Sequence, residues 1–144
     1  MYSPNVGSIL LVGSDADERD RLGMAIKEAG HEAVLASSLH EARALISEGG
    51  IDVIVIDSDD PRGGVVELAR SLDTLPDAPP IVLVSNNPSA PEISARIGAA
   101  VFLTKPYEQP ELLAVLSGLL GELRPVRVVS DEPSGPIRQF GQSS

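Results

Sequence analysis

Four short apolar runs, each followed by polar residues, constrain the fold of this chain more than any other feature. The runs cover residues 9–12, 53–56, 81–84 and 101–103. Strands that are buried on both faces of a parallel sheet read as continuous apolar runs of this length. Asp57 and Ser85 directly follow the second and third runs, and Thr104-Lys105 follows the fourth. Because a doubly wound sheet collects ligands outside the carboxyl ends of its strands, we expect Asp57, Ser85 and Lys105 to converge at one edge.

Helical patterns separate these strands, which is typical of βαβ units. The spacing of apolar residues predicts helices over residues 15–29, 65–72, 91–97 and 110–120, and a further short strand over 32–36. Another helix opens at Ser38, forms a capping box with Glu41 and closes at Gly49-Gly50. Since crossovers in such units are right-handed, the sequence predicts a single α/β domain with a doubly wound parallel sheet in the strand order 2-1-3-4-5.

The length of 144 residues fits one domain with a proper core. We expect this domain to cover residues 1–123. Residues 124–144 are rich in Pro, Gly and Ser and are expected to form a flexible tail. Val126, Val128 and Val129 leave open an added edge strand within it.

Composition excludes several classes of function. No run approaches the roughly 20 apolar residues of a membrane-spanning helix, and residues 1–7 lack the features of a secretory signal, so we expect a cytoplasmic protein without membrane contact. The net charge of −10 argues against nucleic-acid binding. The chain has no cysteine, and its two histidines, His31 and His40, are expected to be solvated rather than to bind metal.

Two stretches have a joint spacing that is more specific than either alone: residues 51–57 followed by Pro61, and residues 98–106, which end in Lys105-Pro106. In these stretches the chain resembles the receiver domain of two-component response regulators, over residues 8–120. The resemblance implies a flavodoxin-like (βα)5 fold and a role in signal relay. It also implies the roles of four residues. Asp57 matches the phosphoryl acceptor, Ser85 the hydroxyl residue that follows the phosphate, Lys105 its cationic partner and Phe102 the aromatic switch.

The end of the first strand departs from the family pattern. Receiver domains usually carry two adjacent acidic residues there that hold Mg²⁺, and this chain has Gly13 and Ser14. Phosphoryl transfer to a carboxylate depends on a cation that neutralises the transferring group. Asp57, Asp59 and Asp15 remain as candidate ligands, and we expect them to bind Mg²⁺ weakly.

The sequence therefore predicts an atypical receiver: a non-enzymatic signalling module that contacts a histidine kinase or a downstream protein, with weak or absent Mg²⁺-dependent phosphorylation at Asp57. Residues 107–120 belong to the family's usual dimerising face, and we expect this face to be used, with a homodimer as one outcome. Two alternatives stay open. One is a working phosphoreceiver with a rearranged acidic site in which Asp15 replaces the missing pair. The other, of a different class, is a flavodoxin-like protein that binds a small molecule or cofactor at the same strand ends.

Overall fold

The computed structural model describes residues 7–59, 64–75 and 77–123. Five parallel strands form one sheet in the order β2-β1-β3-β4-β5, which confirms the predicted topology. The strands are β1 (Ser8–Gly13), β2 (Glu32–Ala36), β3 (Val53–Asp57), β4 (Ile81–Ser85) and β5 (Val101–Thr104). The register pairs Gly13 with Asp57, Asp57 with Val84 and Ser85 with Thr104, so the carboxyl ends of these four strands lie level to within one residue.

A helix follows each strand, and the predicted positions are confirmed to within a few residues. The helices are α1 (Ala16–Glu28), α2 (Leu39–Ser47), α3 (Gly64–Leu72), α4 (Ala90–Ile97) and α5 (Gln109–Leu123). At eight residues, α4 is the shortest of the described helices. The proposed tail and the valines within it lie outside the described residues.

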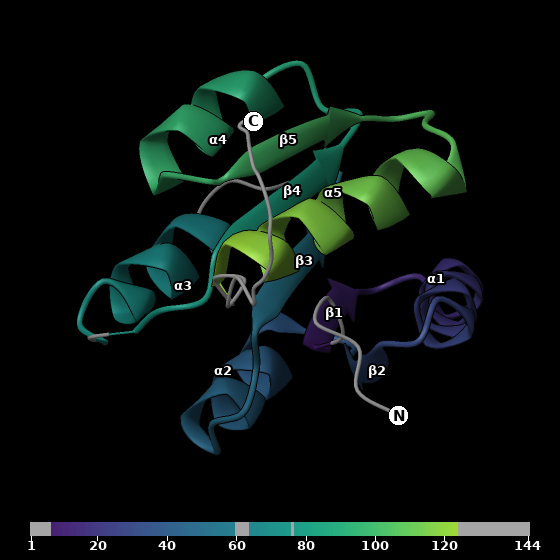
Figure 1. Cartoon of the computed structure of the whole chain (residues 1–144). Coiled ribbons are helices and arrows are strands. Elements are labelled where there is room, and N and C mark those ends of the chain that lie inside the picture. Colours follow the sequence, from purple (N-terminus) through teal and green to yellow (C-terminus); the bar gives the residue numbers. More distant parts are fainter. Residues whose placement is uncertain (1–6, 60–63, 76, 124–144) are drawn as a thin grey trace, which may run out of the picture.

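The helices cover both faces of the sheet in two groups (Figure 1). The α2, α3 and α4 helices pack on one face, against alternate strand residues such as Leu10 and Ile54. The α1 and α5 helices pack on the other face, against residues such as Leu11 and Val55. Because β1, β3 and β4 are buried on both faces, their sequences are apolar throughout rather than alternating.

Local hydrogen bonds set where two of the helices begin. Asp15 caps α1, because its carboxylate accepts a hydrogen bond from the Glu18 N–H at 3.1 Å. Ser38 caps α2 by accepting from the Glu41 N–H at 3.1 Å. The Glu41 carboxylate accepts from the N–H and the hydroxyl of Ser37, one residue earlier than the capping box requires.

The prediction for His31 was wrong. This side chain is 6 % exposed, and its Nδ1 is buried without a hydrogen-bond partner among the described residues. The His31 N–H donates to the carbonyl oxygen of Ile26 at 3.2 Å, so the turn after α1 folds the imidazole inward ahead of β2. His40 is exposed, as expected. Within the described ranges, no helix is long and apolar enough to cross a membrane.

Candidate functional site at the carboxyl edge of the sheet

Lys105 is the centre of a cluster of charges at the carboxyl edge of the sheet. Its ammonium nitrogen lies 2.6 Å from Asp57 Oδ1 and 3.2 Å from Asp59 Oδ1. The Asp57 side chain is 8 % exposed and that of Lys105 is 16 % exposed, whereas Asp59 is about half exposed. The expected convergence of Asp57 and Lys105 at this edge is therefore confirmed. Asp59, in the loop after β3, also contacts Lys105.

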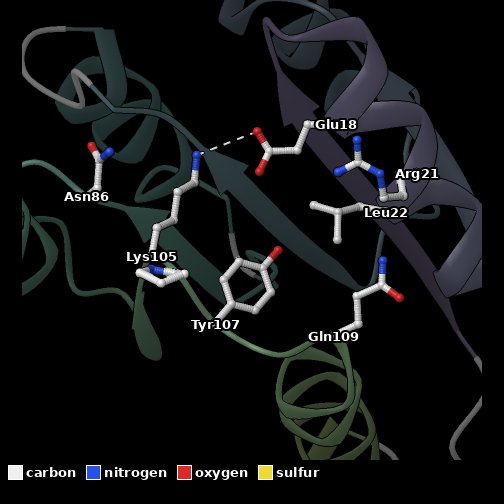
Figure 2. Close-up of a pocket in the computed structure, with 8 residues that line it drawn as sticks. Glu18, Arg21, Leu22, Asn86, Lys105, Tyr107 and Gln109 are labelled. Atoms are coloured by element: carbon white, nitrogen blue, oxygen red, sulfur yellow. Dashed lines mark ion pairs between the residues drawn. The ribbon is translucent and has the colours of Figure 1, made fainter.

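A third carboxylate reaches this ammonium from α1. Glu18 Oε1 lies 3.7 Å from Lys105 Nζ. Figure 2 shows the two groups facing each other across a pocket of about 410 Å³, with the Tyr107 ring beside them. The pocket lies between α1 and the segment that joins β5 to α5. One ammonium is thus shared by carboxylates from α1, from β3 and from the loop that follows β3.

The charges in this cluster hold Lys105 in its protonated form. Burial by itself lowers the pKa of the ammonium. The hydrogen bond and charge of Asp57, with smaller contributions from Asp59 and Glu18, outweigh burial and raise the pKa above its ordinary value. Lys105 is therefore a permanent cation next to Asp57 at neutral pH.

At the end of β1, where the family usually has carboxylates, the Gly13 carbonyl group faces the Arg19 side chain from α1. The Arg19 Nη1 donates to the carbonyl oxygen of Gly13 at 2.7 Å. Ser14 and Asp15 are exposed, and the Asp15 carboxylate caps α1. The carboxylate next to Lys105 on this side comes from Glu18, not from Asp15.

These residues fit a Mg²⁺ ion poorly. Magnesium demands near-octahedral oxygen ligation. Asp57 Oδ1 already accepts from Lys105, and the Asp59 carbonyl oxygen accepts from Asn87 Nδ2 at 2.9 Å. Among the residues that the structure describes, no group of three or more His, Cys, Asp and Glu side chains is arranged to hold a metal ion. The cation that contacts Asp57 in this structure is the ammonium of Lys105.

Ser85 lies at the same edge, where its hydroxyl supports a turn. The residue is fully buried, and its Oγ accepts from the Asn87 N–H at 3.0 Å. Its carbonyl oxygen accepts from the Lys105 N–H at 3.1 Å, which ties the end of β4 to the residue after β5. Ser85 therefore helps to hold the backbone of Lys105 and the loop that contacts Asp59.

The two aromatic residues near the site lie on opposite faces of the sheet. Phe102 is half-buried against the core under α2, α3 and α4, and Tyr107 packs against the core under α1 and α5. Burial, followed by the negative charges of Asp57 and Glu18, raises the pKa of the Tyr107 hydroxyl to about 12. Tyr107 thus responds to the charges of the site, whereas Phe102 faces the neighbourhood of α4.

Sequence reasoning did not single out Glu18, Arg19 or Tyr107. The phase of a helix at its first turn depends on the capping residue, so the direction of Glu18 follows only once Asp15 is known to be the cap. One signal was present: Glu18 and Arg19 are long charged side chains in the first turn of the helix that follows Gly13 and Ser14.

Comparisons with known proteins agree with this fold. The family model of the response regulator receiver domain matches residues 9–117. The phosphate regulon transcriptional regulatory protein PhoB of Pseudomonas aeruginosa is 31% identical over 122 residues, which are 82% of this chain and 53% of that protein. The response regulator MprA of Mycolicibacterium vanbaalenii is 33% identical over 119 residues, covering 81% of this chain and 52% of that protein. The chain thus spans about half the length of these relatives.

Solved structures show the same architecture. The receiver domain of the Francisella response regulator 1452 superimposes with a TM-score of 0.72 at 24% identity, covering 81% of this chain and 98% of that one. The signal receiver domain of a histidine kinase from Syntrophus aciditrophicus gives a TM-score of 0.73 at 25% identity, with 86% and 97% covered.

A parallel 2-1-3-4-5 sheet with an aspartate, a hydroxyl residue and a lysine at its carboxyl edge defines a receiver-type signalling domain. The chain belongs to the response regulator receiver domain family.

Proposed function

We propose that this chain is an atypical receiver that relays signals through protein contacts and is phosphorylated at Asp57 slowly or not at all. The observation that carries the proposal is that Asp57 Oδ1 is paired with Lys105 while β1 ends in Gly13 and Ser14, without a carboxylate. A transferring phosphoryl group would meet the negative charges of Asp59 and Glu18 without the dication that normally offsets them.

Within this proposal, Ser85, Lys105 and Phe102 stand at the positions that match the family, but they do not form a phosphate-dependent switch. A ligand shifts an equilibrium between two conformations only if it binds them with different affinity. If Asp57 is not phosphorylated, no phosphoryl group is present to change the conformation of Ser85 and Phe102, and the chain stays in one conformation. The domain ends at residue 123 in this proposal, and the module has no enzymatic activity of its own.

Labelling with acetyl phosphate tests the proposal directly. In millimolar Mg²⁺, intact-mass analysis should find less than about 10% of the chain labelled. The variant Gly13→Asp/Ser14→Asp should gain label, and adding Asp57→Asn to that variant should remove it. Rapid and stoichiometric labelling of the native chain would refute the proposal and favour the working phosphoreceiver.

The proposed output surface includes residues 107–120, and the proposed partners are a histidine kinase, a downstream signalling protein or a second copy of this chain. Ala114 is exposed on α5 and Ala44 is exposed on α2, which makes them a matched pair. Sedimentation should show that Ala114→Glu weakens self-association, whereas Ala44→Glu and Asp57→Ala do not. A chain that stays monomeric at every accessible concentration would exclude the homodimer. A cytoplasmic location is part of the proposal and rests on the signalling role of the family.

A further inference from the structure

The charges around Lys105 are unequal in number. Three carboxylates, those of Glu18, Asp57 and Asp59, lie within 4 Å of a single ammonium. If the charge on Asp57 is removed, two carboxylates still lie next to Lys105. Opposite charges at such distances favour the charged form of a lysine and hold it in place. The carboxylates around the ammonium therefore outnumber its single positive charge, and two of them remain if Asp57 is neutralised.

The two additional carboxylates are fixed by contacts that do not involve Asp57. Asp59 Oδ1 accepts from the Asn86 N–H at 3.2 Å, and the Asp59 carbonyl oxygen accepts from Asn87 Nδ2. These contacts attach Asp59 to the loop after β4. A change at Asp57 leaves them intact.

Glu18 is fixed from α1. Its N–H donates to the Asp15 carboxylate at the helix cap, and the next residue, Arg19, donates to the carbonyl oxygen of Gly13. The first turn of α1 is thereby attached to the end of β1, and the Glu18 side chain, 31% exposed, extends from it over Lys105.

We infer that Glu18 is a positioning residue that, together with Asp59, keeps Lys105 over the site whatever the charge at residue 57. The inference rests on the proposed function and adds a mechanism to it. Lys105 leads directly into Tyr107 and α5, so a lysine that does not respond to Asp57 isolates the proposed output surface from the acceptor position. Glu18 acts only through Lys105 and has no chemical step of its own.

The chain offers an internal reference for testing this, because Lys27 and Lys105 are its only lysines. Lys27 is exposed near the end of α1, about 13 Å along the helix from Glu18. An amine-acylating reagent reacts with the free amine, so an ammonium held by carboxylates reacts slowly. Peptide mass spectrometry gives the ratio of Lys105 to Lys27 modification, and we expect this ratio to be about 0.1 or lower in the native chain.

The decisive comparison uses two double variants. Asp57→Asn alone should change the Lys105 to Lys27 ratio by less than about 3-fold, because Glu18 and Asp59 remain. Asp57→Asn/Glu18→Gln should raise it about 3-fold or more above Asp57→Asn, because of the three carboxylates only Asp59 then remains beside Lys105. Asp57→Asn/Asp17→Asn is the matched control, since Asp17 is an exposed acid in the same helical turn, and it should behave as Asp57→Asn does.

A further variant keeps the test decisive if Asp57→Asn/Glu18→Gln does not fold. Asp57→Asn/Glu18→Asp retains the charge on α1 but withdraws it by one methylene, and it should raise the ratio by a smaller factor, about 2-fold above Asp57→Asn. Release of Lys105 by Asp57→Asn alone, or equal ratios in the Glu18 and Asp17 double variants, would overturn the inference. Rapid labelling by acetyl phosphate would refute the proposed function instead, so the two failures are distinguishable.

Discussion

Lys105 Nζ lies 2.6 Å from Asp57 Oδ1, so the residue that matches the family's phosphoryl acceptor is neutralised by a cation that belongs to the chain. In receivers of the usual type, the acidic pair on the first strand brings a dication to this place. At this edge of the sheet, Lys105 also lies 3.2 Å from Asp59 Oδ1 and 3.7 Å from Glu18 Oε1.

Divalent cations should bind weakly at Asp57, with a dissociation constant in the range of about 10 mM or above, because the ligand set is poor for an octahedral ion. A side chain at residue 13 has room, since a Cβ built on Gly13 lies 3.6 Å from the Asp57 Cβ, an ordinary contact. Gly13→Asp/Ser14→Asp should therefore strengthen binding by about 10-fold or more, as NMR titration with Mg²⁺ would measure. Submillimolar binding to the native chain would contradict this prediction.

Removing the Lys105 ammonium should destabilise the fold. Lys105→Met leaves the Asp57 carboxylate, 8 % exposed, without its nearest cation. We expect a loss of about 1–3 kcal/mol in the free energy of unfolding, less than for a fully buried pair because Lys105 and Asp59 retain contact with water. Lys27→Met, an exposed change of the same type, should cost less than about 0.5 kcal/mol. Urea denaturation at neutral pH compares the two, and equal losses would show that the ion pair does not stabilise the chain.

Acid should destabilise the native chain through His31. Burial lowers the pKa of this imidazole from its ordinary value of 6.5, so the folded state favours the neutral form. As the pH falls through 6.5, the unfolded state takes up the proton first, and the free energy of unfolding decreases. His31→Phe should show a smaller decrease between about pH 7 and pH 5, while His40→Gln, at an exposed position, should follow the native chain. Identical pH profiles for all three chains would contradict this.

The sequence predicted the fold well because its signals are local. Continuous apolar runs predicted the buried strands, and Ser38 and Gly49-Gly50 marked the ends of α2. The convergence of Asp57 and Lys105 could be predicted as well, because the carboxyl ends of parallel strands share one edge. Asp57 is the last residue of β3, and Lys105 directly follows the last residue of β5. At these positions the geometry of the strands determines the direction of the side chains.

The rest of the site depends on the direction of side chains at the start of α1, which the helical spacing of apolar residues does not specify. Glu18 reaches Lys105 only because Asp15 sets the start of α1 and Arg19 attaches its first turn to Gly13. His31 follows Gly30, which has a φ of 99°, a value that favours glycine. A polar residue directly after such a turn is expected to be exposed. The Ile26 carbonyl instead draws the His31 backbone under the end of α1. These hydrogen bonds join residues three to six positions apart, but the spacing of apolar residues does not predict which side chains or carbonyl groups form them.

Tyr107 should report the charge of the site. Burial, then the charges of Asp57 and Glu18, raises the pKa of its hydroxyl from 10.0 to about 12. In a Tyr2→Phe background it is the only tyrosine, so the ultraviolet absorbance of the phenolate follows it alone. Glu18→Gln should lower the pKa by about half a unit, because a negative charge that opposes ionisation is lost. Asp17→Asn, in the same turn of α1, should leave it unchanged.

The sign of the accompanying stability change follows from the same shift. A group whose folded pKa is raised binds its proton more tightly in the folded state, so its contribution is complete below the unfolded value of 10.0. As the pH rises from 10.0 towards 12, the unfolded chain loses the proton first and the free energy of unfolding falls. Tyr107→Phe should flatten this part of the profile, and Glu18→Gln should make it shallower. A titration near 10 in the folded chain, unaffected by Glu18→Gln, would show that Tyr107 does not sense the charges around Lys105.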